Sequence, residues 1–220
     1  MATSYRDKLL LGGSLVFAII YLFALPYGLY PAKPFVKAPA VLLLCAYAYL
    51  HCEGRERLLL CGALLLSDLG DIFLALEPGF FLHGLISFLV AHLFYIALFL
   101  RYREGSLSAR HIFISIGFVI YGIGLVYWMY PSLGSMAVPV MVYAAILLGM
   151  GISANMGSFG TPMVALGALS FIISDSGIAI DKFHMPVEWF GYVTWSLYVL
   201  AQFLIVLGVT TQQRVGSYGS

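Results

Sequence analysis

The sequence predicts an all-α membrane protein, a bundle of eight transmembrane helices joined by short loops, with both termini in the cytoplasm. Three observations support this prediction. The 220 residues are 62% hydrophobic and 10% charged, and a water-soluble domain with a mean hydropathy of +0.98 would precipitate. Apolar runs of about 20 residues, long enough to cross a bilayer as a helix, recur along the chain. The Lys and Arg residues fall mostly on one side of these runs.

Each expected helix is an apolar run bounded by charged residues or by Pro and Gly. The first run follows Arg6 and Lys8. The second run is short, and Pro31, Pro34 and Pro39 mark its approach, because proline interrupts helical hydrogen bonding everywhere except in the first turn. The eight runs cover residues 9–28, 38–52, 57–76, 81–100, 111–129, 136–154, 161–180 and 187–209.

The basic residues predict the orientation, because cytoplasmic loops carry an excess of Lys and Arg. Eight of the 11 basic residues fall on one side of the runs, namely Arg6, Lys8, Arg55, Arg57, Arg101, Arg103, Arg110 and Arg214. The other side receives Lys33, Lys37 and Lys182, so both termini are expected inside the cell. The short loops leave no room for a soluble domain. We therefore expect a single membrane domain over residues 1–209 and a flexible polar tail over residues 210–220.

Several function classes lack their usual residues. A net charge of +1 without a basic cluster argues against nucleic-acid binding. The three cysteines have no C-x-x-C spacing, and the chain has no H-E-x-x-H motif, so neither a metal nor another cofactor is expected. Serine-hydrolase elbows and nucleotide-binding glycine loops are also missing from the sequence. Chemistry by carboxylates remains.

The third run carries Asp68 and Asp71 in LLLSDLGDIFLAL. An ionised carboxylate at membrane depth costs about 2.5 to 3.5 kcal/mol, which suggests a functional use. Ser67, Asp68 and Asp71 are expected on one helical face, because residues three and four apart are neighbours on a helix. The simpler alternative is that these acids hydrogen-bond to neighbouring helices and hold the bundle together.

The seventh run repeats the tetrapeptide Ser-Asp-x-Gly at Ser174 and Asp175. The third and seventh helices are expected to run in the same direction, so Asp175 could lie in the same layer as Asp71. Two carboxylates brought together in a low dielectric cannot both ionise easily, so one is expected to hold a proton while the other stays charged. Asp71 and Asp175 are therefore candidates for an acid/base pair.

Other polar residues could support this pair. His92 and Tyr95 share a face of the fourth run, where a buried histidine is either structural or functional. Tyr198 and Gln202, four apart on the eighth run, could bind a polar head group or merely bond to a neighbouring helix. Lys33, like Lys37 on the outer side, could meet a lipid phosphate or simply snorkel to the interface.

Five short motifs in order resemble the YhhN-like membrane proteins, the lysoplasmalogenase family. The resemblance covers most of the chain, although Asp68 matches no position of the pattern. The motifs are Lys33-Pro34, S-x-x-G-D-x-x-L from Ser67, G-L-x-x-F-x-x-A-H-x-x-Y from Gly84 to Tyr95, S-D-x-x-x-A-x-x-x-F from Ser174, and Y-x-x-A-Q from Tyr198 to Gln202.

The resemblance implies an eight-helix hydrolase that splits the vinyl-ether bond of a lysoplasmalogen into a fatty aldehyde and a glycerophospho-alcohol. Asp71 and Asp175 would then be the catalytic acid and base, in either order. Asp68, His92, Tyr95, Ser67 and Ser174 would support them, and Lys33, Tyr198 and Gln202 would contact the glycerol or phosphate of a lysophospholipid.

Two other functions fit the buried acids: a proton-coupled transporter and a non-catalytic lipid-binding bundle. Short loops and the lack of a eukaryotic retention signal favour a bacterial inner membrane. The head-group preference and the oligomeric state stay open.

Overall fold

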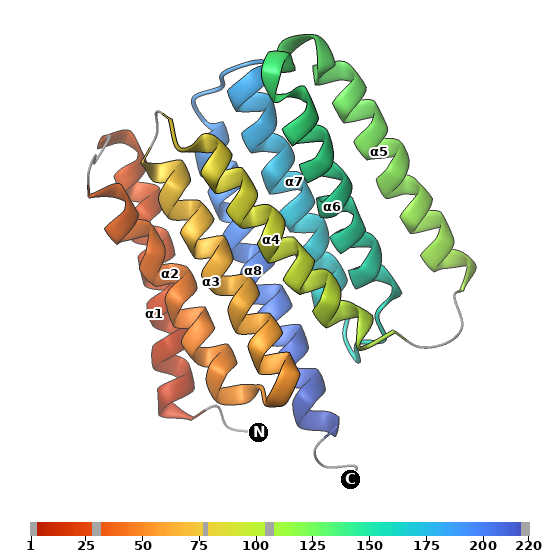
Figure 1. Ribbon diagram of the computed structural model, residues 1–220. Helices are drawn as coiled ribbons and strands as arrows, with labels where there is room; N and C mark the ends of the chain where they lie inside the picture. The colour runs from red at the N-terminus through yellow and green to blue at the C-terminus, as the bar shows by residue number, and fades with distance from the viewer. Residues whose placement is uncertain (1–3, 28–31, 77–78, 104–107, 217–220) are drawn as a thin grey trace. The chain divides into compact units, whose positions relative to one another are not determined.

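A computed structural model describes residues 4–27, 32–76, 79–103 and 108–216. These residues form eight α-helices and two short 3-10 helices, and the described part contains no β-strand (Figure 1). The α-helices are α1 (Tyr5–Ala24), α2 (Lys33–His51), α3 (Gly54–Ala75), α4 (Phe81–Leu100), α5 (Ala109–Leu133), α6 (Ala137–Met156), α7 (Met163–Phe183) and α8 (Phe190–Gly216).

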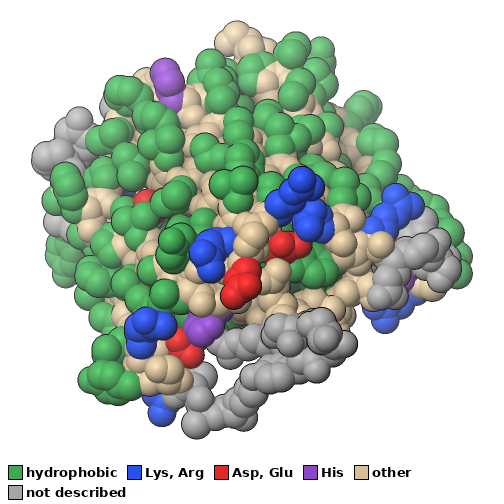
Figure 2. Space-filling view, turned by 60° about the horizontal axis from the view of Figure 1, so that its bottom comes forward, with side chains coloured by type: hydrophobic (Ala, Val, Ile, Leu, Met, Phe, Trp, Pro, Cys, Tyr) green, Lys and Arg blue, Asp and Glu red, His purple; other side chains and the backbone are tan. Residues whose placement is uncertain are grey.

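The chain is an integral, multi-pass membrane protein. Seven segments are long and apolar enough to cross a bilayer, and one of them, Ala109–Met156, contains both α5 and α6. In Figure 2 hydrophobic side chains cover most of the visible face and charged side chains gather in one part of it, a surface suited to lipid contact. The all-helical prediction is confirmed, whereas eight membrane crossings and a cytoplasmic location of both termini stay predictions.

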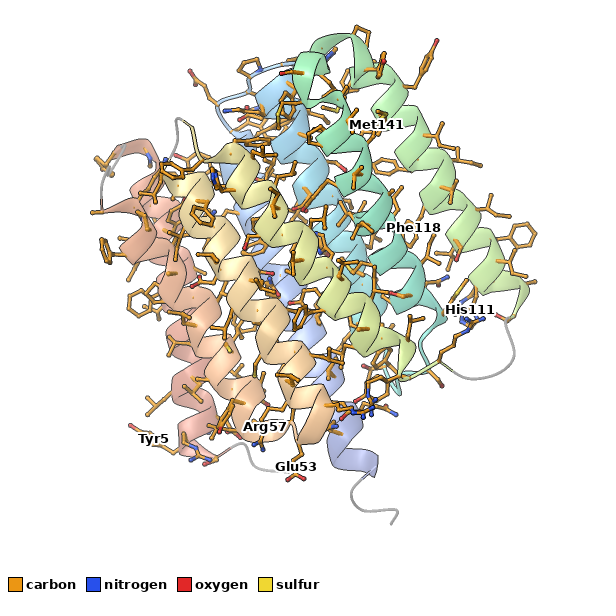
Figure 3. The ribbon with its side chains drawn as sticks, viewed as in Figure 1. Tyr5, Glu53, Arg57, His111, Phe118 and Met141 are labelled. Carbon is orange, nitrogen blue, oxygen red and sulfur yellow. The ribbon has the colours of Figure 1, made fainter. Side chains whose placement is uncertain are left out.

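The helices fall into two compact units. The first unit contains Met1–Phe94 and Val209–Ser220, and the second contains Tyr95–Gly208. In the first unit α2 packs against both α1 and α3. His51 Nε2, in the last turn of α2, lies 2.8 Å from Asp7 Oδ1 in the first turn of α1, so these two helices run antiparallel. Tyr5, Glu53 and Arg57 therefore share one end of this unit (Figure 3).

The second unit is built on α5, α6 and α7, which pack against one another. Met129, Leu133 and Val140 form a buried cluster at the turn from α5 to α6, and partly buried residues of α7 cover it. The unit also contains most of α8, which closely approaches α7. An added Cβ on Gly167 of α7 would lie 2.9 Å from the Ala201 carbonyl oxygen of α8. Gly167 therefore lets the two backbones approach each other.

Helix α2 begins at Lys33, five residues before the predicted start at residue 38. Pro34 occupies the first turn, where the missing N–H costs no hydrogen bond. Pro39 lies inside the helix and removes one backbone donor, which the surrounding helix tolerates. The earlier start places Lys37 on a helix within the bundle rather than in an outer loop.

Helix α8 continues to Gly216 and so includes residues 210–216, which the sequence assigns to a flexible tail. Thr210 is buried, and Gln213 Oε1 accepts a hydrogen bond of 3.0 Å from the Glu53 N–H. Residues 210–216 include no proline, so no helix-breaking proline ends the helix at Val209. Residues 217–220 lie outside the described part of the chain.

Replacing Gly167 with Ala is expected to destabilise the protein by about 1 to 3 kcal/mol, because the new methyl group would meet the Ala201 carbonyl and the Ile205 side chain. The matched control is Gly124→Ala, since no described atom outside its own helix lies within 4 Å of a Cβ there. Thermal unfolding in detergent should show a lower midpoint for Gly167→Ala alone. Equal midpoints for both variants would contradict the close packing of α7 and α8.

Candidate active site

One face of α3 carries three buried polar residues, Ser67, Asp68 and Asp71. Their three- and four-residue spacing places them within one helical turn, as the sequence predicts. Gly70, between the two acids, lies under the Phe88 ring of α4, which an added Cβ would approach to 2.6 Å. The polar face is therefore enclosed by neighbouring helices of the first unit.

Asp71 forms an ion pair with Lys37 of α2. The Lys37 Nζ lies 2.6 Å from Asp71 Oδ1, and the two side chains are only 12% and 4% exposed. The same ammonium lies 5.6 Å from the centre of the Tyr21 ring of α1, so three helices surround it. Sequence reasoning placed Lys37 at the outer end of the bundle and missed this contact. The contact could have been predicted from the rule that a buried carboxylate needs a cationic partner, here on a neighbouring helix.

Asp68 and Ser67 complete the polar face of α3. Among the described residues, neither Asp68 Oδ1 nor Ser67 Oγ has a hydrogen-bond partner, although both atoms are buried. Buried polar atoms of this kind usually bind water, and both could bond to a water or a substrate oxygen. His92 is fully buried on α4, and Lys33 is half-buried as the first residue of α2.

Asp175 is buried on α7 in the second unit. The Tyr143 hydroxyl of α6 donates a hydrogen bond to Asp175 Oδ2. Sequence reasoning missed Tyr143, because one tyrosine in an apolar run gives no sign of the helix it will face. The hydroxyl of Ser174, which is predicted to support Asp175, donates a hydrogen bond of 2.8 Å to the Thr194 carbonyl oxygen and so ties α7 to α8.

Tyr95 and Gln202 bond to each other inside the second unit. The Tyr95 hydroxyl lies 2.5 Å from Gln202 Oε1, and neither residue is exposed. Phe171, one turn before Asp175 on α7, meets the rings of both Tyr95 and Tyr198 edge to face. Tyr95, Tyr198 and Gln202 therefore form one packed group beside the helix that carries Asp175.

The two candidate catalytic aspartates belong to different units, Asp71 to the first and Asp175 to the second. Their pairing therefore stays a prediction. Within its own unit, Asp71 contacts Lys37 and Asp175 contacts Tyr143. Arg110, His111, Asn155 and Thr161 are among the residues that line a polar cavity of about 510 Å³ in the second unit. None of the predicted site residues lines this cavity. The described residues contain no group of three or more His, Cys, Asp and Glu side chains placed to hold a metal ion.

Comparisons with known proteins agree with the motif pattern. Residues 32–209 match the model of the YhhN family. The chain is 36% identical over 181 residues to a protein of Mycobacterium bovis named lysoplasmalogenase. The aligned region covers 80% of this chain and 69% of that protein. The chain is 32% identical over 198 residues to human lysoplasmalogenase TMEM86A, covering 80% and 78% of the two chains. No solved structure matches the chain described here. The resemblance predicted from five short motifs is confirmed, and the chain belongs to the YhhN family.

Proposed function

We propose that this protein hydrolyses the vinyl-ether bond of a lysoplasmalogen and releases a fatty aldehyde and a glycerophospho-alcohol. The observation that carries the proposal is a pair of buried aspartates on membrane helices, each with a polar partner, in a chain similar to proteins named lysoplasmalogenase. Buried acids of this kind are expensive in a bilayer and so mark functional sites. Asp71 and Asp175 also occupy the positions that the family motifs match.

The reaction needs an acid and a base but no other reagent than water. The acid protonates the β-carbon of the vinyl ether, which leaves an oxocarbenium ion on the α-carbon. Water adds to that carbon and gives up a proton to the base, which produces a hemiacetal. The hemiacetal collapses when its hydroxyl returns a proton to the first carboxylate and the base protonates the departing oxygen. Asp71 and Asp175 supply the two carboxyl groups.

The remaining site residues orient these groups and the substrate. Asp68 and Ser67 adjoin Asp71 on α3, so they are placed to bind water near it. His92 and Tyr95, on one face of α4, would orient an aspartate or the attacking water. Ser174 acts indirectly by fixing α7 against α8. Lys33, Tyr198 and Gln202 would contact the glycerol or the phosphate.

The proposed setting is a bacterial inner membrane that both supplies the lysophospholipid and takes up the aldehyde. The chain would cross it eight times as a single domain with both termini in the cytoplasm. Metal ions and organic cofactors have no step in this mechanism.

Purified protein in detergent is expected to release aldehyde from a lysoplasmalogen. It should not cleave the matching alkyl lysophospholipid, because a saturated ether has no double bond to protonate. The acyl analogue should also stay intact, since its ester has no enol-ether double bond for the acid to protonate. Mass spectrometry of the three lipids measures all these outcomes. Release of fatty acid from the acyl lipid, or no aldehyde from the lysoplasmalogen, would contradict the proposal.

The same assay separates an enzyme from a transporter. An enzyme works in detergent, where no gradient exists, whereas a proton-coupled transporter moves labelled lysolipid only across sealed vesicles and depends on the pH gradient. Vesicle uptake without aldehyde release would favour the transporter, and binding without either would favour a lipid-binding protein.

A further inference from the structure

The Lys37–Asp71 ion pair joins two helices that already pack along their length. Helices α2 and α3 are in direct contact, and Cys45 of α2 and Cys61 of α3 contact each other's backbone carbonyl at 3.9 and 3.7 Å. Replacing a buried ion pair with apolar residues of similar volume is often neutral or stabilising. Helices α2 and α3 therefore have other contacts besides this ion pair, which leaves its charges available for another role.

Among the described residues, the Lys37 ammonium contacts the carboxyl group of Asp71 and interacts electrostatically with that of Asp68. Lys37 lies against Asp71 and within electrostatic reach of Asp68, while Tyr21 presents its ring from α1. One positive charge can balance only one negative charge. The contact of 2.6 Å to Asp71 Oδ1 decides which carboxyl receives it.

We infer that Lys37 is a positioning residue that keeps Asp71 as the carboxylate, so that Asp71 is the member of the proposed pair that takes the proton from the attacking water. This inference rests on the proposed function. Without Lys37, a buried carboxyl group with Asp68 as its neighbour would take up a proton and could no longer act as a base. In this role Lys37 acts through Asp71 and needs no contact with the vinyl ether or the water.

Steady-state kinetics on four purified proteins test the role in catalysis. Lys37→Met is expected to lower kcat by about 100-fold while KM changes by less than about threefold, since an orienting charge acts on the chemical step. Lys37→Arg keeps the charge and should retain at least about a tenth of kcat. Lys8→Met, an exposed lysine in the first turns of α1, is the control and should match wild type. A normal kcat for Lys37→Met would overturn the inference.

Infrared difference spectroscopy tests the protonation state without any substrate. The spectrum of wild type minus Asp71→Asn should contain a carboxylate band and no band of a protonated acid. In the Lys37→Met background the same difference should contain the acid band instead. A protonated-acid band in the wild-type difference that persists when Asp68 is also replaced by Asn in both proteins overturns the inference, even where Lys37→Met does not fold.

The two sets of measurements test the proposed function and the role of Lys37 independently. If wild type releases no aldehyde from lysoplasmalogen, the proposed function is wrong, while the infrared bands still decide whether Lys37 holds Asp71 as the anion. If aldehyde is released but Lys37→Met is fully active, the function stands and the role of Lys37 is wrong.

Discussion

Asp71→Asn is expected to lower the rate of aldehyde release by about 1,000-fold or more, within the range that general acid/base groups contribute. Asparagine has the same shape as aspartate and can still accept a hydrogen bond from Lys37 through its amide oxygen. It cannot take a proton from water, so only the chemical step should suffer. A coupled aldehyde assay in detergent, with saturating lysoplasmalogen, measures the effect on kcat.

The matched control is Asp181→Asn, which makes the same change on α7. Asp181 Oδ1 accepts a hydrogen bond of 2.8 Å from the Val187 N–H after the end of α7, and an asparagine oxygen can replace it. This control should keep the wild-type rate. Asp71→Asn activity equal to that of Asp181→Asn would show that Asp71 has no part in the chemistry.

Folding must be separated from chemistry, because Asp71→Asn leaves the Lys37 ammonium beside a neutral group. Breaking a buried ion pair on one side typically costs about 3 to 5 kcal/mol. The double variant Lys37→Met/Asp71→Asn removes both charges and should recover much of the thermal stability. It should remain inactive, so a stable but inactive double variant shows that the loss of rate does not come from unfolding.

Local patterns predicted the helices and the polar face of α3 well. Apolar runs bounded by charges define helices directly, since a bilayer demands both apolar side chains and internal backbone hydrogen bonds. The three-residue spacing of Asp68 and Asp71 fixes their common face in any α-helix. These features depend on neighbours along the chain, which the sequence contains.

Partners on other helices were harder to predict. The sequence predicts Lys37 at the outer end because the apolar run begins at residue 38, whereas α2 begins at Lys33 and includes both Pro34 and Pro39. Tyr143 gives no signal at all, since only the rotation of α6 against α7 brings its hydroxyl to Asp175. Ser174 adjoins Asp175 in sequence, yet its short side chain turns to the Thr194 carbonyl. Each outcome depends on how neighbouring helices rotate and slide, which periodicity does not encode.

The predicted Asp71–Asp175 pair belongs to the same class of problem on a larger scale. The two acids come from different units, so their separation is a property of how the units assemble. Sequence spacing suggested only that both helices run in the same direction. Replacing each aspartate separately and measuring aldehyde release tests whether both take part in the reaction.

Asp175→Asn is expected to reduce aldehyde release as severely as Asp71→Asn, by about 1,000-fold, because an amide cannot protonate the vinyl carbon. Tyr143→Phe should have a smaller effect of about tenfold, since it removes one hydrogen bond and leaves the carboxyl group in place. The matched control is Tyr127→Phe on α5, where the tyrosine is 83% exposed and should be dispensable.

The ratio of these effects identifies what Tyr143 does. If the hydroxyl only orients Asp175, Tyr143→Phe lowers kcat and leaves the catalytic step dependent on Asp175, so adding Asp175→Asn produces no more loss than Asp175→Asn alone. Full activity of Asp175→Asn would instead mean that Tyr143 and Asp175 only tie α6 to α7. The proton donor would then have to be another carboxyl group, and Asp68, buried beside Asp71 on α3, would be the next candidate.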